Sequence, residues 1–181
     1  MNDETKKIYT ILQDIFKNVW EQQKYSEVKN GVLLTFNVAM FAVVARVYFN
    51  ISSSISANIY AKGVFFILIL LFIIHLIIIV QSFFPKDSNK ENIKWTNDEI
   101  NIFFFGDIAK LKSPKYLDLL IKKINMEKSK VIVEPLLDIS NQIVKLSEIT
   151  QSKYRAFKSS VIRMYFLGGF YLVYFSYLYF T

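Results

Sequence analysis

Apolar residues recur every three or four positions along the first thirty residues, with charged side chains between them. This spacing predicts an amphipathic helix over residues 4–29. Such a helix lies either on the inner membrane surface or against other helices, and the sequence leaves both arrangements open. Its apolar positions are Ile8, Ile11, Leu12, Ile15, Phe16, Val19 and Trp20.

Three further segments are apolar and close to the length of about 17–25 residues that a transmembrane helix needs. The first, VLLTFNVAMFAVVARVYF (32–49), is only just long enough, whereas the second, GVFFILILLFIIHLIIIVQSFF (63–84), carries no charge. The polar residues 50–62 connect them, so the two spans are expected to form a hairpin. The third span, 161–180, is rich in tyrosine. Tyrosines in its middle must face protein or a polar path, and packing against neighbouring helices is the simpler interpretation.

The most regular pattern in the chain follows Pro135, where apolar residues are spaced alternately by three and four. This near-heptad seam continues into the third span without a helix breaker. It predicts one long helix over 135–180, or two nearly collinear ones, with a cytosolic stalk below and a membrane span above. The seam positions are Leu136, Ile139, Ile143, Leu146, Thr150, Tyr154, Phe157, Val161 and Met164.

The remaining residues, between the hairpin and the stalk, form a polar and helical insert. It begins with the polar stretch 86–99, which ends in a possible capping box from Thr96 to Glu99. Ser113 and Pro114 then predict a helix start, with serine as N-cap and proline at the first helical position.

These elements make the expected fold class an all-α membrane protein. An amphipathic N-terminal helix leads into a transmembrane hairpin, a helical cytosolic insert, and a long stalk helix that continues into a third span. The expected division is an amphipathic cytosolic helix (1–30), a transmembrane hairpin (31–85), a cytosolic helical sensor and stalk (86–160), and a C-terminal transmembrane helix (161–181).

Composition and charge support a membrane protein and indicate its orientation. Hydrophobic residues make up 53% of the chain, above the roughly 45–50% of an average soluble domain. The net charge of +7 is explained by anionic lipid and topology, without a nucleic acid polymer as partner. Residues 86–160 carry fourteen Lys and Arg, whereas residues 50–62 contain only Lys62. The positive-inside rule therefore predicts a cytoplasmic N-terminus and a cytoplasmic 86–160 segment.

Catalytic motifs are absent from the sequence. The chain has one histidine and no cysteine, and it lacks a glycine-rich phosphate loop. Its carboxylates are scattered among lysines, as on solvated helix faces. We therefore expect neither an enzyme nor a metal site.

His75 is the lone histidine and lies in the middle of the uncharged second span. An ionisable side chain at that depth is a candidate for function, because burying it in lipid is costly. The alternative is a neutral imidazole hydrogen-bonded to a neighbouring helix, for example to a tyrosine of the third span. Asn37 and Arg46 in the first span extend the same hypothesis, since the three residues would give an oligomer a polar, pore-lining face. Arg46 is also close enough to the outer end to reach the interface.

The segment FFFGDIAK (103–110) places three aromatic residues among lysines and asparagines. Alternating burial would put Phe103 and Phe105 on one face of a short extended piece and Phe104 on the other. Gly106 would then permit a tight turn or a close backbone approach, and Asp107 would cap a helix starting at Ile108.

Two interpretations of this corner follow. It either packs against the stalk, or it forms a ligand pocket in which an aromatic ring stacks on a base and helix amides hold a phosphate. Lys110 or Lys153 would supply the counter-charge.

Three segments together resemble the transmembrane effectors of bacterial Pycsar anti-phage systems. They are KNGVLLTFN entering the first span, FFGDIA followed by YL, and DISNQIVKLSEITQSKYRAFK before the last span. The resemblance covers the chain from about residue 25 to its end. The matching positions are Asn37, Phe105, Gly106, Asp107, Gln142, Lys153 and Tyr154.

The resemblance implies an effector in the bacterial inner membrane that a cognate nucleotide cyclase activates through a diffusible product. The activating ligand would be a cyclic pyrimidine mononucleotide, cCMP or cUMP. Disruption of the bilayer, as a homo-oligomer, would then abort the infection. One departure from such systems is that the chain has no recognisable separate β-domain for the nucleotide.

Three functions remain open at this point. The first is a ligand-gated, pore-forming effector with a site near Phe105, Gly106, Asp107, Lys110, Lys153 and Tyr154. The second is a membrane scaffold without gating. The third is a small channel or transporter-like subunit that uses His75 and the tyrosines.

Overall fold

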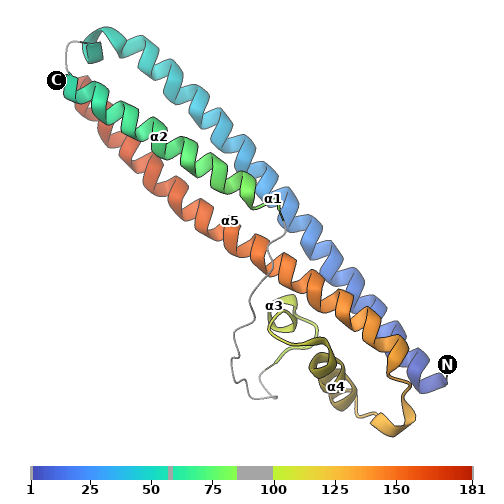
Figure 1. Cartoon of the computed structure of the whole chain (residues 1–181). Coiled ribbons are helices and arrows are strands. Elements are labelled where there is room, and N and C mark those ends of the chain that lie inside the picture. Colours follow the sequence, from blue (N-terminus) through green and yellow to red (C-terminus); the bar gives the residue numbers. More distant parts are fainter. Residues whose placement is uncertain (1, 57–58, 85–99, 181) are drawn as a thin grey trace. The chain divides into compact units, whose positions relative to one another are not determined.

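The computed structural model describes residues 2–56, 59–84 and 100–180. Its elements are α1 (Asp3–Ser56), α2 (Ile59–Gln81), α3 (Phe105–Ile108), α4 (Ser113–Lys123), a 3₁₀ turn η1 (Lys128–Lys130) and α5 (Glu134–Phe180) (Figure 1). The described residues form helices and no strand, which confirms the all-α fold class. The polar stretch 86–99, with its possible capping box, lies outside the described residues.

Two helices are several times longer than an ordinary globular helix. α1 runs for 54 residues and joins the predicted N-terminal helix to the first span without a break. α5 runs for 47 residues, so the prediction of one long helix is confirmed. The predicted connection over 50–62 is shorter than expected, because α1 continues to Ser56 and α2 begins at Ile59. Serine and asparagine each cost less than about 0.7 kcal/mol in a helix, which cooperative elongation readily overcomes.

α1, α2 and α5 are each long and apolar enough to cross a membrane. The chain is accordingly a membrane protein. The contacts between its residues divide the chain into two compact units, and both α1 and α5 contribute to each unit. The first unit comprises residues 1–27 and 85–154, and the second comprises residues 28–84 and 155–181.

In the first unit, α1 and α5 run parallel. The Ile132 backbone N–H donates to the Thr5 hydroxyl over 3.1 Å, and Lys153 forms an ion pair with Glu27 further along both helices. The N-terminal helix packs on other helices here, which decides between its two predicted arrangements. The buried residues of this part of α1 form one hydrophobic core with those of α4 and α5. The core includes Ile8, Leu12, Ile15, Val19, Tyr116, Leu117, Leu120, Leu136 and Ile143.

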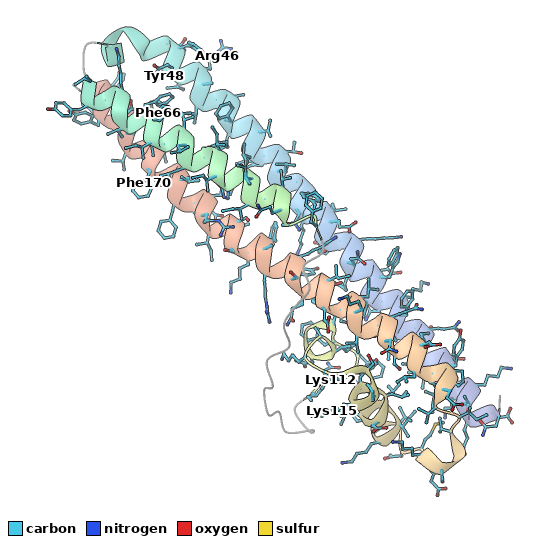
Figure 2. The ribbon with its side chains drawn as sticks, in the orientation of Figure 1. Arg46, Tyr48, Phe66, Lys112, Lys115 and Phe170 are labelled. Atoms are coloured by element: carbon cyan, nitrogen blue, oxygen red, sulfur yellow. The ribbon has the colours of Figure 1, made fainter. Side chains whose placement is uncertain are left out.

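The second unit combines the later part of α1 with α2 and the later part of α5. Aromatic rings stack between α1 and α2: Phe72 stacks on Phe41, and the Tyr48 and Phe65 centroids are 4.0 Å apart. Other aromatic and aliphatic side chains of these helices point outward, as Figure 2 shows for Phe66. An apolar exterior of this kind suits a lipid environment.

The central tyrosines of the third span are packed against protein, as predicted. The Tyr171 hydroxyl donates to the Leu68 carbonyl over 3.0 Å, and the Tyr174 hydroxyl donates to the Ala61 carbonyl over 2.9 Å. Both rings are buried. Each hydroxyl therefore has a partner inside the unit, as a polar group in a membrane requires.

Candidate functional site

Residues 103–110 form a one-turn helical corner, so the prediction of an extended piece buried on both sides was wrong. Phe104 is extended and precedes α3, and its carbonyl accepts from the Asp107 and Ile108 N–H groups, each over 3.0 Å. The Asn101 side chain accepts from the Phe103 N–H over 2.9 Å. These local hydrogen bonds replace the partner strand that an extended piece would need. Phe103 and Phe104 remain about half exposed, and Phe105 packs against the core.

Asp107 is not the cap of a helix that starts at Ile108, because α3 already begins at Phe105. One of its carboxylate oxygens accepts from the Asn101 N–H over 3.2 Å, and the other pairs with Lys110 at 2.6 Å. Asp107 therefore links Asn101, before the corner, to Lys110 at its end. The predicted helix start at Ser113 is also displaced by one residue, with Lys112 in the N-cap position.

Gly106 is required for space. A Cβ atom there would lie 2.5 Å from Cε1 of the Phe104 ring, closer than real Cβ contacts come. No described glycine has a positive φ, so Gly106 does not serve a left-handed turn. The predicted close approach is confirmed, with a neighbouring aromatic ring as its partner.

We expect Gly106→Ala to lower the stability of the full chain by about 1 kcal/mol, because the added methyl group forces the Phe104 ring aside. The ring is half exposed and has room to move, which limits the cost. In detergent, thermal unfolding should shift down by about 2–4 °C. The matched variant Phe104→Ala/Gly106→Ala should unfold at the same temperature as Phe104→Ala alone. An equal loss from Gly106→Ala in both backgrounds would contradict this explanation.

The corner docks onto α5 through two contacts one turn apart. The Gln151 side-chain amide donates to the Gly106 carbonyl over 3.1 Å. The Phe105 ring stacks on Tyr154, with centroids 5.3 Å apart and planes inclined by 24°. Residues three apart on a helix share a face. Gln151 and Tyr154 therefore present one face of α5 to the corner.

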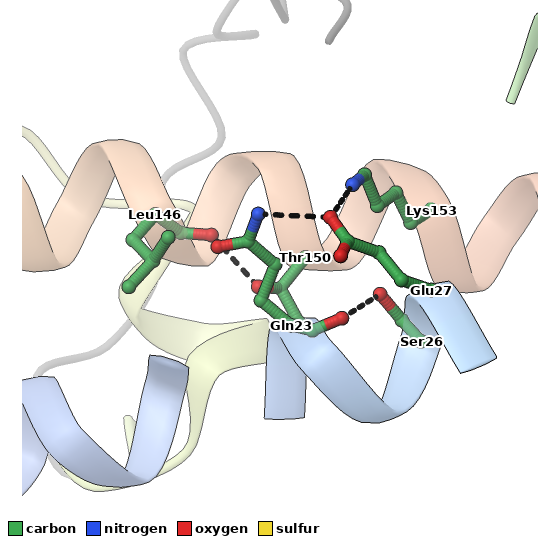
Figure 3. Close-up of polar contacts among 6 residues, drawn as sticks. All are labelled: Gln23, Ser26, Glu27, Leu146, Thr150 and Lys153. Carbon is green, nitrogen blue, oxygen red and sulfur yellow. Dashed lines mark hydrogen bonds and ion pairs between the residues drawn. The ribbon is translucent and has the colours of Figure 1, made fainter. Parts of the chain in front are cut away.

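Lys153 lies at the centre of a polar network between α1 and α5 (Figure 3). Its side chain is only 7% exposed, and its ammonium group forms a hydrogen-bonded ion pair with Glu27 Oε1. The Gln23 side-chain amide donates to the same oxygen over 3.3 Å. The neighbouring Tyr154 hydroxyl donates to Gln22 Oε1 over 3.2 Å. α5 thus contributes a buried cation and an aromatic ring, and α1 supplies the polar side chains that hold them.

Small hydroxyl residues fill the seam around this network. Ser26 donates to the Gln23 carbonyl over 2.7 Å, and Thr150 donates to the Leu146 carbonyl over 2.8 Å (Figure 3). Gln23 Oε1 and Ser147 Oγ are among the buried atoms that have no hydrogen-bond partner in the described residues. A buried polar atom without a partner costs about 1–3 kcal/mol. These two atoms could therefore form hydrogen bonds with a group from outside the described residues.

Three groups of the corner and network have shifted pKa values. The hydrogen bond from Lys153 lowers the pKa of Glu27, against a smaller opposing effect of burial. Burial would raise the pKa of Asp107, but hydrogen bonds from Lys110 and Asn101 and nearby lysine charges together lower it. Burial raises the pKa of the Tyr154 hydroxyl. Both carboxylates are therefore ionised and the tyrosine is neutral at physiological pH.

Of the six residues predicted for the ligand site, the structure stacks Phe105 on Tyr154 and places Gly106 against Gln151 of α5. Lys153, the residue before Tyr154, pairs with Glu27 of α1. Asp107 and Lys110 form their own ion pair on α3 and the residues after it. The prediction missed the α1 and α5 side chains that complete the network, namely Gln22, Gln23, Glu27 and Gln151.

The three membrane residues do not form one polar face. Arg46 is exposed (Figure 2), whereas Asn37 is buried and its amide donates to the Leu33 carbonyl over 2.8 Å. Nine residues separate them, which on a helix places them on opposite sides and about 14 Å apart along the axis. The prediction of a shared pore-lining face was therefore wrong for this pair.

His75 is buried in the second unit with 2% of its surface exposed. Neither imidazole nitrogen has a hydrogen-bond partner among the described residues. The predicted bond to a tyrosine of the third span is absent there, because Tyr171 and Tyr174 donate to backbone carbonyls instead. An unpaired ionisable side chain inside a membrane helix bundle is destabilising, which favours a functional reason for it.

Comparison with known proteins gives one match. A family model described as a Pycsar effector protein domain matches residues 11–181. No curated protein and no solved structure matches the chain. The match covers the second unit, the first unit from residue 11 onward, and all the candidate residues described above.

Proposed function

The chain belongs to the Pycsar effector family and is an anti-phage effector, and on that premise we propose that a cyclic pyrimidine mononucleotide, cCMP or cUMP, activates it to disrupt the inner membrane. The resemblance found in the sequence is thereby confirmed at the level of the family. What we propose beyond the family is the identity of the activating nucleotide, the disruption of the bilayer and the abortive infection that results. A cognate cyclase supplies the ligand, and the effector acts without catalysis.

The proposal rests on two features of α5: the buried Lys153 ammonium group, and the ring of the following residue, Tyr154, which stacks on Phe105. A cyclic mononucleotide has one negatively charged phosphodiester and one flat base. Lysine binds phosphate as a compact point charge, and base–aromatic stacking contributes about 1–3 kcal/mol per base. A buried cation and an adjacent aromatic pair therefore match the two halves of this ligand.

The unpaired polar atoms support the same class of ligand. Gln23 Oε1 is an acceptor, so it can receive a hydrogen bond from an amino or imino N–H of a pyrimidine. Ser147 Oγ can donate or accept. A ligand that supplies these hydrogen bonds gains the free energy that both atoms lose in its absence.

Binding would require the site to open. Phe105 and Tyr154 are in contact with each other, so a base inserted between them would have to push the two rings apart. Lys153 is already paired with Glu27. The silent state is thus a state in which the chain itself occupies the places that the base and the phosphate would take.

α1 and α5 provide the route from the site to the membrane. Both helices continue without a break past Glu27 and Tyr154 into the second unit. A change in how the two helices meet at the polar network would alter the packing of the spans. Three spans per chain are too few to enclose an aqueous pore, so the disrupted state would be a homo-oligomer. The N-terminus and the 86–160 segment would be cytoplasmic, where the cyclase product accumulates.

Co-expression with a cognate cyclase tests this function in cells. We expect loss of membrane potential and growth arrest within minutes of cyclase induction, measured with a voltage-sensitive dye. A catalytically inactive cyclase should leave both unchanged. Depolarisation of equal extent with the inactive cyclase would contradict nucleotide gating and would favour a constitutive channel or scaffold.

A further inference from the structure

Glu27 is the anionic partner of the buried Lys153 ammonium group. Its Oε1 atom accepts from both the Lys153 ammonium group and the Gln23 amide. These are the kinds of contact that a phosphodiester oxygen makes with a lysine and an amide. The Glu27 side chain is 46% exposed, so solvent reaches it, whereas Lys153 is almost completely buried.

This asymmetry determines which partner can leave. A carboxylate that is half exposed loses little by turning into water, because most of its hydration is within reach. A buried ammonium group without a counter-charge is far more costly. Lys153 is therefore constrained to keep an anion, while Glu27 is free to be replaced by another one.

From this geometry we propose that Glu27 is an internal competitor for the ligand phosphate, and that it sets the affinity of the sensor by holding Lys153 until the nucleotide arrives. The inference rests on the proposed function and adds the residue that opposes binding. In the silent state Glu27 neutralises Lys153. In the bound state the phosphodiester takes its place and Glu27 turns to solvent.

Gln23 would supply a second hydrogen-bond donor in this exchange. Its amide N–H₂ bonds to Glu27, while its Oε1 atom is buried without a partner among the described residues. When Glu27 leaves, the amide N–H₂ becomes available to the phosphate as well. The phosphate would then accept hydrogen bonds from both the Lys153 ammonium group and the Gln23 amide, in the geometry that these groups already present to the Glu27 carboxylate.

The test is direct binding of cCMP and cUMP to the purified full chain in lipid nanodiscs, compared with Glu27→Gln. This change keeps the shape and the acceptor oxygen and removes the charge. Because an ion pair with one exposed partner contributes up to about 1 kcal/mol, we expect about two- to fivefold tighter binding. Glu21→Gln is the matched control, since it removes the same charge from an exposed position of α1 and should leave affinity unchanged.

A double variant separates competition from a general structural effect. In the Lys153→Met background, Glu27→Gln should have no further effect on affinity, because the shared cation is gone. If the wild-type chain binds nucleotide and Glu27→Gln binds equally well or more weakly, the competition is refuted while the proposed function stands. If the wild-type chain is folded, as its unfolding temperature will show, and binds neither nucleotide, the proposed function itself fails.

Discussion

Lys153→Met is expected to abolish cyclase-dependent depolarisation and to weaken nucleotide binding about 10- to 100-fold. The buried ammonium group belongs to the residue before Tyr154, whose ring stacks on Phe105, and it forms the ion pair with Glu27. A hydrogen bond to a charged group contributes about 1.5–3 kcal/mol, which corresponds to that loss of affinity. Methionine fills a similar volume, and Glu27 is exposed enough to be solvated alone. The fold should therefore survive, which the thermal unfolding temperature will show.

The control for Lys153 is an exposed lysine of the same unit. Lys115 projects from α4 into solvent (Figure 2). Lys115→Met removes the same charge and should leave both depolarisation and affinity unchanged. Normal depolarisation by a folded Lys153→Met chain would exclude the network between α1 and α5 as the sensor.

His75→Leu is expected to leave nucleotide binding intact, to abolish depolarisation and to stabilise the chain. Both imidazole nitrogens are buried without a partner among the described residues. An apolar side chain of similar size removes that cost, so the free energy of unfolding should rise by about 1–2 kcal/mol. The proposed membrane step would lose the only ionisable group of the second span. The stability is measured by thermal unfolding, the affinity by nucleotide binding to the purified chain, and the depolarisation with a voltage-sensitive dye in cells.

His75→Gln provides the matched comparison, because it keeps a polar side chain at the same position. It should retain part of the depolarisation and none of the added stability. If His75→Leu depolarises cells as well as the wild-type chain does, the membrane step does not depend on the histidine. If His75→Leu lowers the unfolding temperature, the imidazole has a structural partner that stabilises the bundle.

The helices could be predicted because their signals are long and periodic. The uncharged run of the second span and the alternating spacing after Leu136 each extend over many turns, so local exceptions do not hide them. The connection over 50–62 was predicted too long, because its polar residues were taken as a loop. Polar residues do not end a helix unless a breaker or a competing cap is present, and residues 50–56 contain no proline or glycine.

The aromatic corner shows where pattern reading fails. Three consecutive phenylalanines fit an extended piece by propensity, but the Asn101 side chain and the Phe104 carbonyl organise a helical turn. The close approach at Gly106 was predictable, since only glycine lacks a Cβ atom. Its partner ring was not, because that depends on a side-chain rotamer.

The α1 half of the site was missed because its residues are polar at core positions. The spacing that begins at Ile8 continues through Gln22, Ser26 and Asn30, but a search for apolar residues stops at Trp20. Polar residues that keep the period of a buried seam would have been the available signal. They mark the layer where Glu27 and Lys153 meet.

We expect the nucleotide alone to open this protein in a bilayer. The most direct measurement is release of a trapped fluorescent dye from liposomes that contain the purified full chain, before and after addition of cCMP or cUMP. We predict little release without nucleotide and rapid, concentration-dependent release with one of the two. Lys153→Met liposomes should stay sealed at the same concentration. Nucleotide gating would be refuted by equal release with and without nucleotide, or by no release from folded protein at saturating concentrations of either nucleotide.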